Sequence, residues 1–216
     1  MYQNVIFDLD GTLLNTLEDL KDSTNYALAQ HGYPTRTLEE VRCFVGNGIR
    51  KLIDRAVPEE TSVEKTDKVF ATFREYYATH SRVKTSMYEG MEQVMDALKE
   101  QNISMAIVSN KADDAVKDLA KYYFAKYIDV AIGEREGISR KPAPDSVYEA
   151  MRLLGATKEN TVYVGDSDVD RATAKNAGIP CISVTWGFRS EELLVSLEPE
   201  YLIHKPEEIL SVVTGK

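Results

Sequence analysis

Short apolar runs and longer amphipathic stretches alternate along most of this chain. The short runs, rich in Val and Ile, are typical of buried parallel strands and predict strands at 5–7, 103–108, 128–132, 161–164, 181–185 and 201–203. The amphipathic stretches between them predict helices at 91–101, 112–120, 146–154, 168–177 and from 206 onward. Strands that alternate with helices predict an α/β fold, with a doubly wound, Rossmann-like parallel sheet that helices cover on both faces.

The segment between the first two predicted strands differs, because its pattern is helical throughout. Apolar residues at helical spacing predict helices at 13–31, 38–44, 49–56 and 63–80. Thr37-Leu38-Glu39-Glu40 has the form of a capping box, and Gly46-Asn47-Gly48 separates the second helix from the third. We therefore expect residues 1–15 and 84–216 to form the α/β core and residues 16–83 to form an inserted all-helical cap.

Two carboxylates, Asp8 and Asp10, follow the first predicted strand and precede Gly11. Side chains at i and i+2 of an extended segment point the same way, so these two carboxylates can converge. Like charges that close repel each other unless a cation or a shared proton compensates them. Mg²⁺ favours carboxylate oxygens together with substrate phosphate, which makes it the candidate cation. A solvated turn is the alternative for an Asp-x-Asp-Gly run taken alone.

Polar groups also follow two later strands, at Ser109 and Asp166. Ligands of parallel α/β sheets bind outside the carboxyl ends of the strands, so these groups should share one crevice with Asp8. A hydroxyl with neighbouring backbone N–H groups suits phosphate, although a Ser-Asn pair alone is more often a helix N-cap. In the run from Asp166 to Asp170, metal binding and helix capping by Ser167 or Asp168 both fit.

Composition and charge limit the classes of partner. The 216 residues suffice for one α/β domain with a smaller companion, and the net charge of −9 (26 basic minus 35 acidic residues) argues against a nucleic-acid surface. Cys43 and Cys181 have no metal or redox spacing, so we expect reduced thiols. The sequence shows neither a secretory signal pattern nor an apolar run of membrane-spanning length, which predicts a cytoplasmic protein without a membrane partner.

The run Phe-Asp-Leu-Asp-Gly-Thr-Leu at 7–13 resembles the first motif of the haloacid dehalogenase superfamily of phosphotransferases. Ser109, Lys141 before Pro142, and Gly165-Asp166 follow in the order of that superfamily's other motifs. Lys141 alone would be a solvated loop charge, and only the other motifs give it a functional interpretation. The resemblance covers essentially the whole chain.

The resemblance implies roles for individual residues. Asp8 would be the nucleophile that forms an aspartyl-phosphate, and Asp10 would be the general acid for the leaving group and then the base for water. Ser109 and Lys141 would hold the phosphoryl oxygens, with Gly11 and Asn110 as further phosphate contacts. Mg²⁺ would be bound by Asp8, the main-chain carbonyl of Asp10 and Asp166, while Asp170 would orient Lys141 or a metal-bound water. Asn15 stands where relatives commonly have Asp, and we expect a local effect there.

The loop from Cys43 to Arg50 resembles the cap loop of phosphoglycolate phosphatases. The resemblance implies that Asn47, Gly48 and Arg50 receive the substrate, with backbone N–H groups near a helix start suited to a small carboxylate. A helix–helix turn with solvated basic residues is the alternative. The run Thr185-Trp186-Gly187-Phe188-Arg189 is also similar to that family, and ordinary packing at a strand end is its alternative.

Taken together, these resemblances imply a Mg²⁺-dependent phosphatase of a small phosphorylated metabolite, best guess 2-phosphoglycolate, that is a monomer or homodimer. A pyrophosphatase, another sugar-phosphate phosphatase or a β-phosphoglucomutase of the same superfamily is the alternative. A phospho-accepting signalling domain of the receiver type is disfavoured, because receivers are shorter, carry the acceptor Asp in mid-chain and lack a helical insertion.

Overall fold

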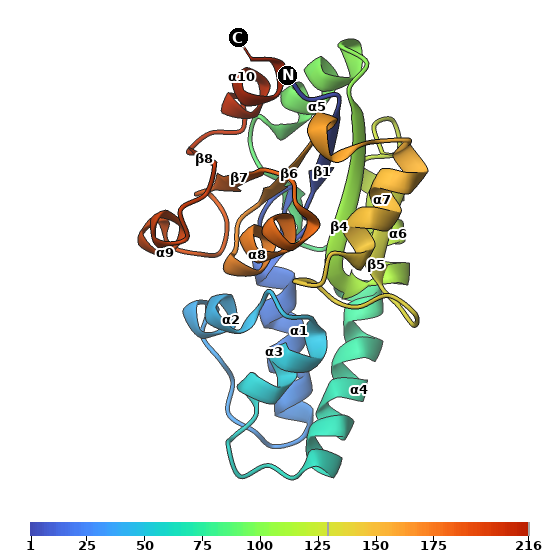
Figure 1. Ribbon diagram of the computed structural model, residues 1–216. Coiled ribbons are helices and arrows are strands. Elements are labelled where there is room, and N and C mark those ends of the chain that lie inside the picture. Colours follow the sequence, from blue (N-terminus) through green and yellow to red (C-terminus); the bar gives the residue numbers. More distant parts are fainter. Residues whose placement is uncertain (129, 216) are drawn as a thin grey trace. The chain divides into compact units, whose positions relative to one another are not determined.

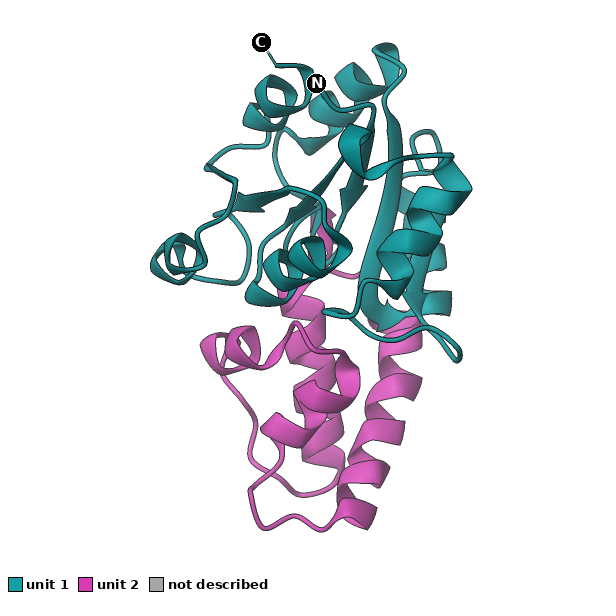
Figure 2. Ribbon diagram, viewed as in Figure 1, with its two compact units in different colours: residues 1–14, 87–216 teal, residues 15–86 magenta. Residues whose placement is uncertain are grey.

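The computed structural model describes residues 1–128 and 130–215 and divides into two compact units (Figure 2). Unit 1 comprises residues 1–14 and 87–216, and unit 2 comprises residues 15–86. Unit 2 begins one residue before and ends three residues after the cap expected at 16–83. The functional roles expected for the two parts, catalysis and substrate specificity, stay predictions.

Unit 1 is built on a parallel sheet (Figure 1). Within the described residues, six strands lie in the order β5-β4-β1-β6-β7-β8, and every pair of neighbours is parallel. Their bounds are β1 Asn4–Phe7, β4 Ser104–Ala112, β5 Val130–Glu134, β6 Thr161–Gly165, β7 Cys181–Val184 and β8 Tyr201–Ile203. The predicted fold class is confirmed.

The alternation of side chains along β1 gives each face of the sheet its own core. Val5 and Phe7 belong to a cluster with apolar residues of α5, α6 and α10, whereas Ile6 belongs to a second cluster with those of α7 and α8. Helices thus cover both faces, as the sequence pattern predicts. Their bounds are α5 Met91–Glu100, α6 Asp113–Tyr123, α7 Asp145–Leu154, α8 Asp168–Ala177 and α10 Glu208–Thr214.

Pairing with both neighbours fixes the register of β1 in the sheet. Phe7 lies opposite Ile107 of β4 and Val164 of β6, and the Asp8 N–H continues the ladder by donating to the Val164 carbonyl at 2.9 Å. The residues that follow β1 and β6 therefore reach the carboxyl edge of the sheet together, beside the last part of β4.

The long elements of unit 2, whose residues are all described, are helices. These are α1 Leu17–Gln30, α2 Leu38–Phe44, α3 Ile49–Ala56 and α4 Val63–His80. The predicted capping box is present, because Thr37 accepts from the Glu40 N–H and the Glu40 side chain accepts from the Thr37 N–H. Helices α1 and α4 pack along each other, and Tyr26 of α1 stacks on Tyr76 of α4 with ring centroids 3.9 Å apart.

The prediction for the start of the first helix is wrong. Helix α1 begins at Leu17, not at residue 13, because Leu13 and Leu14 are apolar for a different reason: they are buried in the core of unit 1. The sequence pattern also missed four short elements. These are β2 Leu14–Asn15 and β3 Ser86–Met87, which form a two-stranded sheet where the chain passes between the units, the 3₁₀ helix Lys158–Asn160, and α9 Glu191–Ser196.

The predicted end of the strand at 103–108 is also wrong. Strand β4 continues to Ala112, with an irregular register beyond Val108, because its outer part pairs again with β5. Ser109 therefore lies inside a strand and is no helix N-cap; α6 begins only at Asp113. Of the strand predicted at 128–132, residue 129 lies outside the described residues.

None of the helices in the described part of the chain combines the length and hydrophobicity that crossing a bilayer requires.

Candidate active site

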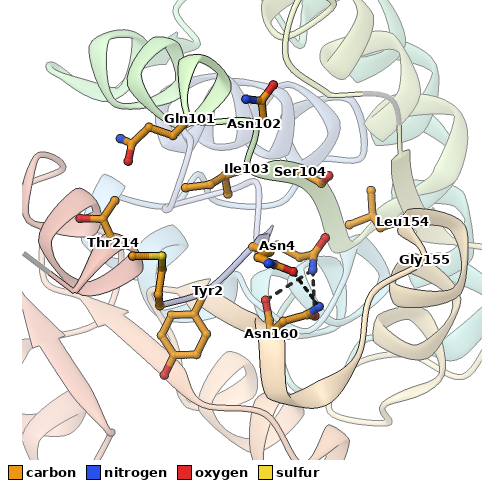
Figure 3. Close-up of a pocket in the computed structure, with 12 residues that line it drawn as sticks. Tyr2, Asn4, Gln101, Asn102, Ile103, Ser104, Leu154, Gly155, Asn160 and Thr214 are labelled. Carbon is orange, nitrogen blue, oxygen red and sulfur yellow. Dashed lines mark hydrogen bonds between the residues drawn. The ribbon is translucent and has the colours of Figure 1, made fainter.

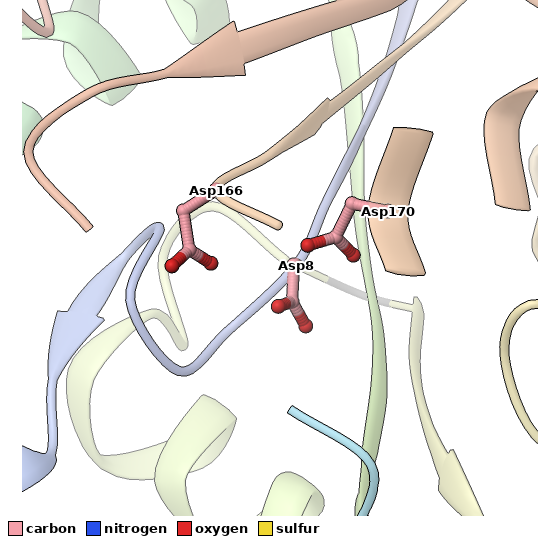
Figure 4. Close-up of side chains that lie close together, drawn as sticks. All are labelled: Asp8, Asp166 and Asp170. Carbon is pink, nitrogen blue, oxygen red and sulfur yellow. The ribbon is translucent and has the colours of Figure 1, made fainter. Parts of the chain in front are cut away.

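Three carboxylates lie together at the carboxyl edge of the sheet in unit 1 (Figure 4). Asp8 follows β1, Asp166 follows β6, and Asp170 lies in the first turn of α8. One oxygen of each lies within 4.8 Å of an oxygen of the other two, and all three residues are buried. The structure thus brings together three residues that are 162 positions apart at the extremes (170 minus 8).

Backbone and hydroxyl donors orient the Asp166 carboxylate. Its Oδ2 accepts from the Phe188 N–H at 2.6 Å, and its Oδ1 accepts from Thr12 Oγ1 at 3.4 Å. The loop after β7 comes this close because residue 187 is glycine, where a Cβ would lie 2.2 Å from the Asp166 Cβ. Trp186, in the same loop, packs against the core and donates through Nε1 to the Thr12 carbonyl. The loop therefore packs at a strand end and also holds Asp166.

The Asp170 carboxylate has at least four hydrogen-bond donors around it. Ser167 donates to Oδ2 through its N–H at 3.1 Å and its hydroxyl at 2.5 Å, and Ser167 in turn caps α8. Lys141 Nζ and the Tyr163 hydroxyl face Oδ1 at 2.7 and 3.1 Å. The predicted capping role of Ser167 is present, and Asp170 connects this cap to the buried lysine.

Lys141 is the cation nearest the acid cluster. Its Nζ lies 2.8 Å from Asp8 Oδ1 and 2.7 Å from Asp170 Oδ1, and it donates to the Tyr163 hydroxyl at 3.0 Å. An ammonium has three protons, so these three acceptors account for all of them. Asn110 holds the Lys141 backbone, because its Oδ1 accepts from the Lys141 N–H and its Nδ2 donates to the Lys141 carbonyl. The amide predicted to contact phosphate is used here to position the lysine loop.

Burial and like charges shift the pKa values of this cluster. Burial and the charge of Asp170 raise the pKa of Asp8 well above its usual range, although Lys141 opposes this shift. Burial, together with Asp170, raises the pKa of Asp166 to about 7. Burial lowers the pKa of Lys141, but the Asp170 and Asp8 carboxylates outweigh it and raise the pKa well above its usual range. An added cation would favour the charged carboxylates.

The carboxylate oxygens of this cluster are suitable ligands for a hard divalent cation. Mg²⁺ and Ca²⁺ take oxygen ligands, and carboxylates are the side chains that most often supply them. Asp170 already accepts from Lys141, Tyr163 and Ser167. Asp8 faces Lys141 through Oδ1, and Asp166 accepts from Phe188 and Thr12, so both of these carboxylates have lone pairs left for a cation. Asp8 and Asp166 are therefore better ligands for such a cation than Asp170.

The remaining predicted residues of unit 1 lie around the cluster. The Asp10 Oδ1 accepts from Lys111 Nζ at 2.9 Å, and Ser109, which is buried, accepts through Oγ from the Lys111 N–H at 3.2 Å. The Gly11 N–H donates to the Leu14 carbonyl at 2.8 Å, so this amide is paired within its own turn. Gly11 has φ +91°, and a Cβ there would lie 2.5 Å from Asp166 Oδ2, so glycine is required beside the cluster.

The three predicted substrate contacts of the cap lie in unit 2. Asn47 accepts through Oδ1 from Arg55 Nη2 at 2.9 Å, and Arg55 Nη1 also donates to the Phe44 carbonyl. Gly48, at φ +83°, precedes α3, whose amino terminus has no side-chain cap. Arg50 pairs with Asp54 at 2.8 Å and with Asp67. Its guanidinium is therefore engaged within the unit.

Two buried residues at the site were missed from the sequence, Lys111 and Tyr163. Lys111 comes two residues after Ser109, so an extended backbone at 109–111 would have placed both on one side of the strand, had β4 been predicted to continue. Tyr163 lies between Val162 and Val164 in a buried strand, where an aromatic side chain indicates core packing. Nothing in the sequence shows that its hydroxyl reaches Lys141.

A hollow lies at the opposite edge of the sheet, near the amino ends of β1, β4 and β6 (Figure 3). Its lining includes the side-chain amides of Gln3, Asn4, Gln101, Asn102 and Asn160, and Asn4 Nδ2 donates to Asn160 Oδ1 at 2.9 Å. No acidic or basic side chain is among these lining residues. Its lining side chains carry no charge, whereas three buried acids and a lysine meet at the carboxyl edge, which is therefore the better candidate for chemistry.

This chain is similar to a family of known hydrolases. The family model described as haloacid dehalogenase-like hydrolase matches residues 5–184. Phosphoglycolate phosphatase 1 of Pseudomonas aeruginosa is 32% identical, over 95% of this chain and 78% of its own length. The pyrophosphatase PpaX of Halalkalibacterium halodurans is 30% identical, over 98% and 97%. The crystal structure of a candidate phosphoglycolate phosphatase from Lactobacillus delbrueckii subsp. bulgaricus superposes with a TM-score of 0.94 at 33% identity, covering 100% of this chain and 99% of that one.

Proposed function

This chain belongs to the haloacid dehalogenase-like hydrolases, and from that premise we propose that it is a Mg²⁺-dependent phosphatase of a small phosphomonoester that acts through a phosphoryl intermediate on Asp8. The observation that carries the proposal is the position of Lys141 Nζ, buried and 2.8 Å from Asp8 Oδ1, beside a cluster of three acidic residues. A carboxylate held between a fixed cation and a candidate metal site is suited to attack an anionic phosphorus centre.

In the first step, an oxygen of Asp8 attacks phosphorus and the bond from phosphorus to the leaving oxygen breaks. Asp10, from the turn after β1, gives its proton to that oxygen. Lys141 donates to a phosphoryl oxygen in place of Asp8. Its hydrogen bonds with Asp170 and Tyr163 remain and keep the ammonium in place. Ser109, at the same edge of the sheet, is the proposed hydroxyl donor to a second phosphoryl oxygen.

In the second step, Asp10 takes a proton from water, and the resulting oxygen attacks phosphorus while the bond to Asp8 breaks. Inorganic phosphate leaves, and Asp8 and Asp10 return to their starting forms. Mg²⁺, held by Asp8, Asp166 and the Asp10 carbonyl, would supply positive charge against the transferring group in both steps.

The best candidate substrate is 2-phosphoglycolate. Support comes from the similarity to phosphoglycolate phosphatase 1 of Pseudomonas aeruginosa and from the glycine at residue 48, which leaves the amino terminus of α3 without a side-chain cap. Arg50 would have to exchange Asp54 or Asp67 for a substrate carboxylate, so we assign the first contact to the backbone at 48–50 and to Asn47. Pyrophosphate is the second candidate, favoured by the similarity to PpaX of Halalkalibacterium halodurans.

The experiment that tests this function compares kcat/KM of the purified protein with Mg²⁺ on 2-phosphoglycolate, pyrophosphate, a hexose 6-phosphate and 4-nitrophenyl phosphate. We expect the highest value with 2-phosphoglycolate. A higher value with pyrophosphate would transfer the assignment to the second candidate. Absence of turnover with every one of these compounds would contradict the phosphatase proposal.

Replacement of Tyr163 by Phe tests how Lys141 is positioned. The change removes one hydroxyl between Lys141 Nζ and Asp170 and leaves the ring in the core. A hydrogen bond to a charged group contributes about 1.5–3 kcal/mol, so kcat should fall roughly ten- to a hundredfold while KM changes little. Steady-state kinetics measure this split.

Tyr127→Phe is the matched control, because Tyr127 is also a mostly buried tyrosine of unit 1 whose hydroxyl bonds an acid, Asp96 at 2.8 Å, away from the acid cluster. It should keep the kcat of the unmodified protein. Equal kinetics for Tyr163→Phe and Tyr127→Phe would show that the Tyr163 hydroxyl has no part in holding Lys141.

A further inference from the structure

Lys111 is a buried cation that the roles assigned so far do not use. Its side chain is 2% exposed, and its Nζ lies 2.9 Å from Asp10 Oδ1. The two residues come from different elements, since Lys111 lies near the end of β4 and Asp10 in the turn after β1. Burying an ammonium is costly unless it is paired and hydrogen-bonded, so this placement requires a compensating interaction, and Asp10 provides one.

Three acids of the site divide between two lysines. Asp8 and Asp170 face Lys141, whereas Asp10 faces Lys111. Asp10 is also the most exposed of these carboxylates, with 21% of its side chain accessible against 11% for Asp8 and 1% for Asp170. A partly exposed carboxylate has several rotamers open to it, and a fixed cation on one side selects among them.

The backbone that carries Lys111 is tied to its neighbours at both ends of an irregular part of β4. Strand β4 pairs with β1 at Ile107 and with β5 at Ala112, so Lys111 lies between two paired positions. Its N–H donates to Ser109 Oγ at 3.2 Å, which ties it to the hydroxyl that we assign to a phosphoryl oxygen. A charge on a segment that is paired at both ends is well suited to hold a side chain that belongs to a turn.

We propose that Lys111 is a positioning residue for Asp10, which holds the Asp10 carboxylate in the orientation from which it exchanges a proton with the leaving oxygen and then with water. This inference rests on the proposed function, because it needs Asp10 to act as acid and base. It predicts that Lys111 acts only through Asp10. A lysine that bound substrate directly would act independently of Asp10 and would mainly change KM.

The test is a double-mutant cycle in single-turnover measurements of leaving-group release with Mg²⁺. The variants are Lys111→Met, Asp10→Asn and the two combined, each with the best alkyl phosphate of the panel and with 4-nitrophenyl phosphate. An alkoxide leaving group needs the proton of Asp10, whereas nitrophenolate leaves without it. Lys111→Met should slow release from the alkyl phosphate roughly ten- to a hundredfold, the range for loss of a hydrogen bond to a charged group, and slow nitrophenolate release much less.

In the Asp10→Asn background, Lys111→Met should change the alkyl-phosphate rate by less than about threefold, because the group that it positions is already lost. Lys111→Arg keeps the charge and should therefore be faster than Lys111→Met. If Lys111→Met does not fold, Lys111→Arg takes its place in the cycle. Lys117→Met is the control for loss of a lysine near the same strand: Lys117 pairs with Asp113 in α6 and its side chain is 58% exposed, so this variant should match the unmodified protein.

Two results would overturn the inference. One is equal slowing of both leaving groups by Lys111→Met, and the other is the same factor of slowing with and without Asp10→Asn. Failure of the proposed function is visible separately, because the unmodified protein would then release no leaving group from any alkyl phosphate.

Discussion

Replacement of Asp8 by Asn is expected to abolish turnover and leave the fold intact. The amide matches the carboxylate in size but has no negative charge with which to attack phosphorus. Loss of a nucleophile in hydrolases that work through a covalent intermediate costs about 10⁴-fold or more in kcat. The residue is buried among Asp166 and Asp170, and those like charges together with burial raise its pKa, so a neutral side chain is tolerated there. Steady-state kinetics and a thermal unfolding curve give the two readouts.

Asp114→Asn is the control for Asp8→Asn, because Asp114 is an exposed acid in the first turn of α6, away from the cluster. It should keep activity within about twofold, as surface substitutions usually do. If Asp8→Asn kept activity within a few-fold of the unmodified protein, the assignment of the nucleophile would be wrong.

Removal of divalent cations is the second change with a very large expected effect. Chelation should take activity to background, and added Mg²⁺ should restore it, because the site otherwise presents buried acids with raised pKa values to an anionic substrate. Ca²⁺ should not restore it, since its larger and looser coordination shell would misplace the phosphoryl group. Mg²⁺ should also raise the unfolding midpoint in the absence of substrate, because a cation that binds only the folded protein stabilises it.

Full activity in excess chelator would mean that Asp8, Asp166 and Asp170 act without a metal ion, beside the cation of Lys141. Restoration by Ca²⁺ as complete as by Mg²⁺ would mean that the site does not discriminate by cation size. The effect of Mg²⁺ on the unfolding midpoint tests metal binding separately from the role of the metal in catalysis. A rise in the unfolding midpoint without restored turnover would show a metal site that is not catalytic.

The fold could be predicted because its strands are buried on both faces and therefore read as short apolar runs. The same rule explains where prediction failed. The apolar pattern places Leu13 and Leu14 in the first predicted helix, because an apolar residue does not reveal which core it enters, and in the structure they lie in the core of unit 1. The outer part of β4 is polar, at Ser109, Asn110 and Lys111, so the apolar run ends before the strand does.

The site residues that directly follow a strand could be predicted from the sequence. Asp8 and Asp166 follow from that rule, and their proximity in the structure follows from the register of β1 and β6. The partners that orient them are not predictable in this way. Tyr163 reaches Lys141 from inside the sheet, and Asn110 holds the Lys141 backbone rather than facing a ligand with both ends of its amide. Such contacts depend on tertiary packing, which no local pattern records.

The central claim is that Asp8 carries the phosphoryl group during turnover. It is tested most directly by mixing the Asp10→Asn variant with 4-nitrophenyl phosphate and Mg²⁺, quenching with acid within one turnover, and locating the added phosphoryl group by peptide mass analysis. Asp10→Asn is used because loss of the base should slow hydrolysis of the intermediate, so that it accumulates. The account predicts a phosphoryl group on the peptide that contains Asp8, and none when Asp8 is also replaced by Asn. A phosphoryl group on Ser109 or another residue, or nitrophenol release with no phosphorylated peptide at any time, would contradict it.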